Sequence, residues 1–122
     1  QYEYNMHCLS EILYEYLASA EGLSEWFADD VVERGDDFFF SWGNSPAEKA
    51  TMIRYKPESF VRFRWEEDEG SKYFFELSIV IDEITDDLSL NITDFCEPGD
   101  EEENQLYWEN LIENLQLKLG AS

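Results

Sequence analysis

The stretch DEEENQLYWENLIENLQLKLG, residues 100–120, decides the fold of this chain. Its apolar residues recur at the spacing of a single helix face, i, i+3, i+4, i+7 and i+11: Trp108, Leu111, Ile112, Leu115 and Leu119. The acidic run at its start is favoured by the helix dipole, and Gly120 stands where a helix C-cap belongs. The pattern predicts one long amphipathic helix from about Asp100 to Leu119. A helix with one apolar face needs a surface on which to bury it.

The chain ahead of this helix is predicted to consist mostly of short strands rich in aromatic residues. Phe60 to Glu66 alternates most clearly, because Phe63 and Trp65 point to one face while Arg62 and Arg64 point to the other. The predicted strands are residues 2–6, 31–32, 38–42, 50–55, 60–66, 73–81 and 88–95. Aromatic residues are common in half-buried strands, so these segments indicate a sheet with one apolar face.

Two short helices are predicted between the first and second strands. Ser10 is placed to cap a helix from Glu11 to about Ala18, because a serine oxygen accepts hydrogen bonds from free N–H groups at a helix start. The buried face of that helix is predicted to be Ile12, Leu13, Tyr16 and Leu17. A turn and a second short helix follow from Ser19 to Phe27. Strands, a helix pair and a final long helix predict an α+β domain in which the long helix packs across the sheet.

The composition favours one folded domain and excludes two classes of partner. The 122 residues suit a single domain with one core, and a hydrophobic content of 43% argues against disorder. The net charge of −21 repels nucleic acid phosphates and anionic membrane surfaces. Seven of the eight basic residues lie between Arg34 and Lys72, and strand alternation points Arg62 and Arg64 away from Phe63 and Trp65, onto a solvated outer face. No apolar run is long enough to span a membrane and no signal peptide is visible, so we expect a cytoplasmic protein.

The sequence contains no motif typical of catalysis or metal binding. His7 is the only histidine, so neither a histidine pair for a metal nor a Ser-His-Asp triad can be built. Cys8 and Cys96 lack metal-ligand spacing and are predicted to lie at opposite ends of paired strands, which excludes a disulfide. The acidic runs 66–69 and 100–103 lack the spacing of a calcium loop. We therefore expect no catalytic residue, no metal site and no cofactor.

The order of one strand, two short helices, six strands and a long helix resembles the helix-grip order of the START-like superfamily, also called SRPBCC. The segment ASAEGLSEWF, residues 18–27, resembles the family's "t-x-x-e-g-l-x-x-W-f" segment between its first two helices. A second similarity is to the family's "P-x-x-L-x-F-x-W" strand, which Pro57, Val61, Phe63 and Trp65 resemble. Trp108, Leu111 and Leu115 resemble the "W-x-x-x-L-x-x-L" pattern of its last helix, with a first spacing of three residues rather than four. The closest group is the activator-of-heat-shock-ATPase homology branch, and the resemblance identifies residues 1–122 as a single START-like domain.

The resemblance implies a curved antiparallel sheet of about seven strands and a deep pocket between this sheet and the long helix. Family members use the pocket for lipids, sterols, polyketides and other apolar molecules, and a few are cyclases or aromatic-ring hydroxylating subunits. The inward residues predicted to line it here are Phe38, Phe40, Trp42, Phe63, Trp65, Phe75, Leu77, Leu90, Trp108, Ile112 and Leu115. The same aromatic side chains are equally suited to filling the space completely. The sequence leaves both outcomes open.

Arg54 is a candidate anchor for a ligand carboxylate or phosphate. This prediction requires that Arg54 and Met52 share the inward face of their strand. The opposite face, which carries Thr51, Ile53 and Tyr55, is an equally good candidate for the inner one.

Three functions follow from these patterns. The leading expectation is non-enzymatic binding of a small hydrophobic, lipid-like molecule by burial of apolar surface. The alternative is a co-chaperone-like protein-interaction module or a homodimer, with a filled core and an exposed apolar patch to which Phe39, Phe60 and Phe74 would contribute. An enzyme of cyclase or hydrolase type ranks last, because it needs convergent polar groups inside the pocket and the inward set is nearly all apolar. Asp94 has the inward parity of the last strand, but it lies near the strand end, where we expect solvent to reach it. Neither nucleic acid binding nor membrane insertion is expected.

Overall fold

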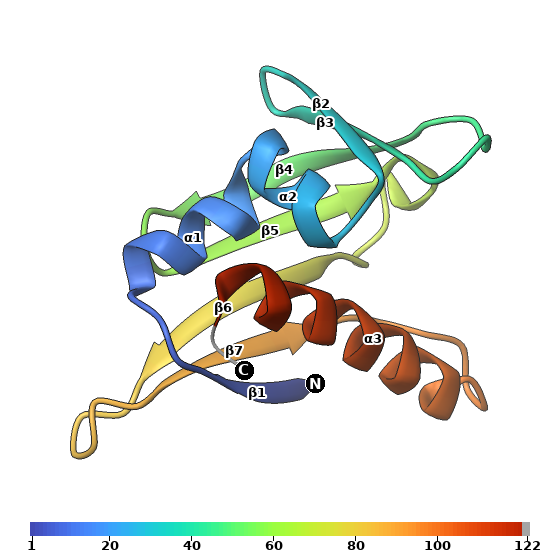
Figure 1. Ribbon diagram of the computed structural model, residues 1–122. Coiled ribbons are helices and arrows are strands. Elements are labelled where there is room, and N and C mark those ends of the chain that lie inside the picture. The colour runs from blue at the N-terminus through green and yellow to red at the C-terminus, as the bar shows by residue number, and fades with distance from the viewer. Residues whose placement is uncertain (121–122) are drawn as a thin grey trace.

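The computed structural model describes residues 1–120, which form one seven-stranded antiparallel sheet and three α-helices (Figure 1). The elements in chain order are β1 (Tyr2–Met6), α1 (Ser10–Ala18), α2 (Ala20–Trp26), β2 (Asp30–Arg34), β3 (Asp37–Ser41), β4 (Glu48–Lys56), β5 (Phe60–Trp65), the 3-10 turn η1 (Glu66–Asp68), β6 (Phe75–Ile81), β7 (Leu88–Thr93) and α3 (Glu101–Leu119). This order confirms the predicted α+β helix-grip fold.

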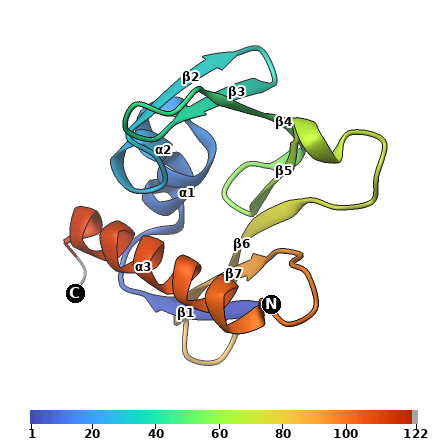
Figure 2. The same cartoon turned by 90° about the vertical axis from the view of Figure 1, so that its right-hand side faces the viewer.

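The strands lie in the order β1-β7-β6-β5-β4-β3-β2. From β2 to β7, each strand pairs with the next in the chain, while β1 pairs with β7 so that the first and last strands are neighbours. The strands β1 and β2 are therefore the two edges, and α1 and α2 carry the chain from one edge to the other. Figure 2 shows the sheet bent around the helices, with α3 lying across its inner side.

Alternation along the strands sends one row of side chains toward the helices. In β5, Val61 and Phe63 are fully buried. In α3 the buried residues are Trp108, Ile112 and Leu115, which belong to the predicted apolar stripe. Burying side chains of this size stabilises the fold by about 1.5–3 kcal/mol each. Packing of this stripe, more than intrinsic helix propensity, therefore holds α3 in place.

The turn between α1 and α2 is closed by small residues. The Ser19 Oγ accepts a hydrogen bond from the Gly22 N–H at 3.0 Å and donates one to the Glu15 carbonyl at 2.7 Å. Gly22 is buried against α1, and a Cβ there would lie 2.2 Å from the Glu15 carbonyl oxygen. The Trp26 indole N–H donates to the Tyr16 carbonyl at 2.7 Å. These contacts give a physical reason for the serine, glycine and tryptophan of this segment.

The start of α1 differs from the prediction. Ser10 lies inside the helix, Leu9 is the N-cap residue and no side chain caps the helix. The Ser10 hydroxyl instead donates to Glu58 Oε1 at 3.3 Å. Ile12, predicted to be buried, is 43% exposed, because Leu13 and Leu17 form the inward face.

A bulge in β4 corrects the prediction for Arg54. The register shifts between Met52 and Arg54, so Met52 pairs with the inward Phe63 while Arg54 pairs with the outward Arg62. An extra residue in a strand reverses the alternation of the faces that follow. Arg54 is exposed, with its guanidinium carbon 5.9 Å from the ring centroid of Phe60. It therefore does not face the space under α3, contrary to the predicted role as a pocket anchor.

Candidate functional site

The space between α3 and the sheet is packed with side chains. Most of the predicted pocket residues expose no more than 2% of their surface: Phe38, Phe40, Phe63, Phe75, Leu77, Leu90, Trp108, Ile112 and Leu115. Trp42 and Trp65 are partly buried and pack against them. The structure thus brings together all the predicted site residues except Arg54, and it brings them together as a core.

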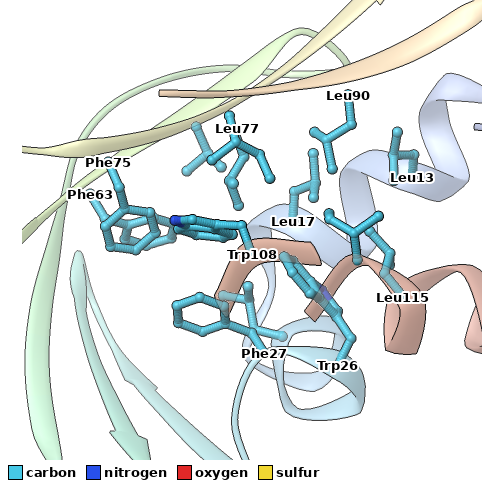
Figure 3. Close-up of a cluster of buried hydrophobic side chains, with 14 of the residues drawn as sticks. Leu13, Leu17, Trp26, Phe27, Phe63, Phe75, Leu77, Leu90, Trp108 and Leu115 are labelled. Atoms are coloured by element: carbon cyan, nitrogen blue, oxygen red, sulfur yellow. The ribbon is translucent and has the colours of Figure 1, made fainter. Parts of the chain in front are cut away.

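The centre of this core is a group of aromatic rings (Figure 3). Phe63 and Phe75 are stacked with ring centroids 5.2 Å apart, and Trp108 from α3 lies 6.1 Å from Phe75. Phe27, just after α2, contacts both of these rings, with its centroid 5.9 Å from Trp108 and 5.7 Å from Phe75. Phe27 is absent from the site predicted from the sequence. Its signals in the sequence were its place beside Trp26, at the end of a short helix, and its match to the last position of the family segment.

Asp94 ties the end of β7 to the middle of α3. The Trp108 indole N–H donates to Asp94 Oδ2 at 2.9 Å, and the Phe95 backbone N–H donates to Oδ1 at 2.8 Å. Burial raises the pKa of Asp94 above its ordinary value, and these hydrogen bonds partly oppose that rise. Sequence alternation placed Asp94 on the inner side, and the structure shows what it does there.

A surface cavity of about 460 Å³ lies next to this contact. It is formed where β5 ends, where β6 begins and where the chain passes from β7 to α3. We call it the mouth cavity, and its lining residues are Trp65, Glu67, Asp68, Tyr73, Phe74, Asp94, Phe95, Cys96, Glu97 and Pro98. Its volume falls in the range typical of small-molecule sites. Of these residues, only Trp65 belongs to the site predicted from the sequence.

The mouth cavity carries negative charge. Four of its lining residues are carboxylates, and none of the described residues that line it is a lysine or an arginine. Desolvation, followed by the charges of Glu101, Asp94 and other nearby acids, raises the pKa of the Cys96 thiol. Two arginines that do not line the cavity contact residues that do: Arg64 Nε donates to the Tyr73 carbonyl at 2.9 Å, and the Arg62 guanidinium carbon lies 4.2 Å from the ring centroid of Phe74. The local field therefore favours a cation over an anion.

Two further hollows lie elsewhere on the described surface. One of about 450 Å³ follows the α1–α2 corner, and one of about 290 Å³ lies between α2, Trp42 and α3. Within residues 1–120, no group of three or more His, Cys, Asp and Glu side chains is placed to hold a metal ion. In the same part of the chain, no helix combines the length and the apolarity that a membrane crossing requires.

Comparison with known families gives one clear match. The family described as a START-like superfamily domain matches residues 1–121. No curated protein matches the chain.

Several solved structures resemble the whole chain. A solution structure of the protein BfR322 from Bacteroides fragilis is 30% identical, with a TM-score of 0.68, over 95% of this chain and 86% of that one. The Aha1 dimer from Colwellia psychrerythraea is 14% identical, with a TM-score of 0.77, over 97% of this chain and 92% of that one. DynU16, described as a putative protein in the dynemicin biosynthetic locus, is 16% identical, with a TM-score of 0.76, over 98% of this chain and 47% of that one.

Proposed function

The chain belongs to the START-like superfamily, and from that membership we propose that it binds a small apolar molecule without catalysing a reaction. Domains of this family typically bind hydrophobic ligands. The observation that carries the proposal for this chain is the mouth cavity, because its aromatic wall is continuous with the packed core under α3. The proposed ligand position is this mouth, between the segment that leads from β7 to α3, the end of β5 and the start of β6.

Trp65 connects the mouth cavity to the core. It lines the cavity, and its ring centroid lies 5.4 Å from Phe75 and 5.5 Å from Phe40. An apolar body placed against Trp65 loses its hydration, which favours binding by about 25 cal/mol per Å² before ordering costs. The outer wall is Phe95, which is 46% exposed and gains the same kind of burial.

Trp108 is the side chain that limits how deep the ligand reaches. It fills the space behind Asp94 and is held there by one polar contact, the hydrogen bond to Asp94 Oδ2. A ligand group that takes over this bond frees Trp108 to move, and the space toward Phe63 and Phe75 then becomes accessible. Binding is in this view coupled to the position of one tryptophan, which makes tryptophan fluorescence a natural readout.

The chemistry of the mouth cavity supports a binding role without catalysis. A nucleophilic cysteine needs a lowered pKa, whereas the pKa of Cys96 is raised. A carboxylate pair for glycoside or cyclisation chemistry would need opposed positions around one reacting bond. Here Asp94 is occupied by the Trp108 indole and the Phe95 backbone N–H.

Native mass spectrometry tests the proposal directly. The purified protein is compared with its denatured mass, then incubated with fatty acids, sterols and apolar extracts. Phe95→Ala, at the mouth, is expected to weaken any binding, while Tyr55→Ala, an exposed aromatic residue on β4, is the matched control and leaves it unchanged. A bare mass under all conditions, with no change in tryptophan emission, would count against the binding function.

A protein-interaction role is the second candidate, and the packed core favours it. The predicted patch is weaker than expected, because Phe39, Phe60 and Phe74 are only partly exposed and the guanidinium of Arg62 covers Phe74 at 4.2 Å. The β6–β7 hairpin offers a better apolar surface, with Ile84 92% exposed. The similarity to a dimeric Aha1 structure supports a homodimer as one form of this role.

Sedimentation velocity separates the two candidates. A dimer that dissociates in the Ile84→Ser variant supports an interaction surface at the hairpin. A monomer at all concentrations, together with a ligand detected by mass, supports the binding function. Leu117→Ser, an exposed apolar position on α3, is the control for a general loss of apolar surface.

A further inference from the structure

We infer that the mouth cavity binds the positively charged head group of its ligand, so that the ligand is an organic ammonium compound with an apolar body. The inference rests on the proposed function and adds the chemical class of the molecule. It is carried by a cavity of about 460 Å³ whose walls combine aromatic rings with carboxylates. The rings can bind an apolar or a cationic group, and the carboxylates favour the cationic one.

Besides Trp65, the aromatic wall contains three rings, those of Tyr73, Phe74 and Phe95. The Phe95 ring centroid lies 5.5 Å from that of Tyr73 and 5.2 Å from that of Phe74. Cations bind over aromatic faces within about 6 Å of the centroid, and groups of such rings recognise organic ammonium ions. One of these rings already holds a cation, since Arg62 covers Phe74 from the outer side at 4.2 Å. Tyr73 and Phe95 remain exposed toward the solvent.

The carboxylates of the mouth are not neutralised within the structure. Glu67, Asp68, Asp94 and Glu97 line the cavity. The ion pairs formed within residues 1–120 involve other carboxylates, those of Asp37, Glu66, Glu76 and Glu25. An anionic head group would therefore meet uncompensated like charge, whereas an ammonium group meets its counter-charge beside the rings.

The position of Trp65 fixes the orientation of the ligand. Trp65 forms the inner wall beside the core, while Glu67 and Glu97 are exposed. The apolar body consequently points toward Trp65 and the ammonium group toward the carboxylates at the rim. A phenylalkyl amine has this shape and fits a cavity of this volume.

Three probes that share one body and differ in head group test the inference: 4-phenylbutylamine, 4-phenylbutanol and 4-phenylbutyrate. Their affinities are measured by isothermal titration calorimetry at about 0.15 M salt, where long-range attraction to the acidic protein is largely screened. We expect the amine to bind about tenfold more tightly than the alcohol, the size of one partly desolvated cation–π contact. The carboxylate is expected to bind weakest.

Two double variants with equal changes of charge locate the effect. Glu67→Gln/Glu97→Gln removes two carboxylates of the mouth, and Asp30→Asn/Glu33→Gln removes two from the exposed edge strand β2. The first variant should bring the amine close to the affinity of the alcohol, and the second should keep the tenfold preference. An equal loss in both variants would overturn the inference, because the attraction would then be general. Equal affinities of all three probes would overturn it while leaving the proposed function intact, and no binding of any probe would argue against both.

Discussion

The hydrogen bond between Trp108 and Asp94 joins the core to the mouth cavity at the level of single residues. The indole is buried in an apolar stripe, and a buried N–H group needs a partner. Asp94 supplies that partner at 2.9 Å because it follows β7 on the inner side, below the middle of α3. The bond therefore fixes the position of Trp108 and keeps the Asp94 carboxylate partly buried. Both consequences can be tested, one by replacing the tryptophan and the other by following stability with pH.

Replacing Trp108 by phenylalanine should destabilise the protein by about 2–4 kcal/mol. The change removes a hydrogen bond to a charged group, worth about 1.5–3 kcal/mol, and leaves a small cavity. Trp42→Phe is the matched control, because its indole N–H donates to the neutral Phe27 carbonyl at 3.0 Å and should contribute only about 0.5–1.5 kcal/mol. Urea denaturation followed by far-ultraviolet circular dichroism gives both values. Equal losses would mean that the Asp94 contact adds nothing special.

The raised pKa of Asp94 predicts a specific pH dependence of stability. Above the ordinary pKa of 3.8, the unfolded chain releases this proton while the folded protein still holds it. The contribution of Asp94 is therefore fully present below the unfolded pKa and is lost as pH rises through the higher folded value. Asp94→Asn removes this titration. The free energy of unfolding of the variant, relative to the wild type, should increase as pH rises from about 4 to about 7. A difference that stays constant with pH would contradict the raised pKa.

At the scale of elements, the α1–α2 corner depends on how closely two helices approach. Gly22 lies where α2 touches the end of α1, and there is no room for a side chain beside the Glu15 carbonyl and the Tyr16 Cα. The backbone contact also brings Trp26 within reach of the Tyr16 carbonyl. The corner places Phe27 against Trp108, so the geometry of two short helices determines the centre of the core.

Gly22→Ala should cost about 3 kcal/mol or more. The added Cβ would lie 2.2 Å from a backbone oxygen, and overpacking that moves backbone exceeds the ordinary cost of about 1–3 kcal/mol. Gly35→Ala is the control, because its φ of 62° makes alanine unfavourable by about 1–2 kcal/mol although nothing lies near its Cβ. Thermal denaturation compares the two, and near-ultraviolet circular dichroism should show disturbed tryptophan packing only in the first. A Gly22→Ala variant as stable as Gly35→Ala would show that α2 can move away freely.

Elements with strong periodicity could be predicted, and their local irregularities could not. In β5 and α3 the spacing of apolar residues identified the buried face, because burial of one face is what the pattern records. In β4 the bulge between Met52 and Arg54 leaves no such record, since both alternations of that segment carry apolar residues. The orientation of Arg54 was decided by pairing with β5, which is a tertiary effect.

At the scale of the whole molecule, the sequence predicted which residues meet under α3 but not whether they leave room for a ligand. Periodicity reports direction, whereas a pocket depends on volume, and Phe27 supplies the volume that the strand pattern did not include. The mouth cavity also escaped prediction, because most of its lining comes from residues 66–74 and 94–98, which join strands and helix. Side chains of connecting segments have no periodicity from which to infer where they point.

The net charge of −21 predicts that salt stabilises the whole fold. Folding brings the carboxylates closer together, and at about 0.01 M ionic strength the Debye length of about 30 Å lets them all repel one another. Raising sodium chloride to about 0.5 M should increase the melting temperature by about 5 °C, which corresponds to about 1 kcal/mol for a domain of this size. Differential scanning calorimetry measures the shift, with potassium chloride as the control. The two salts should coincide at equal ionic strength, because screening depends on ionic strength alone, whereas a difference between them would indicate a bound cation.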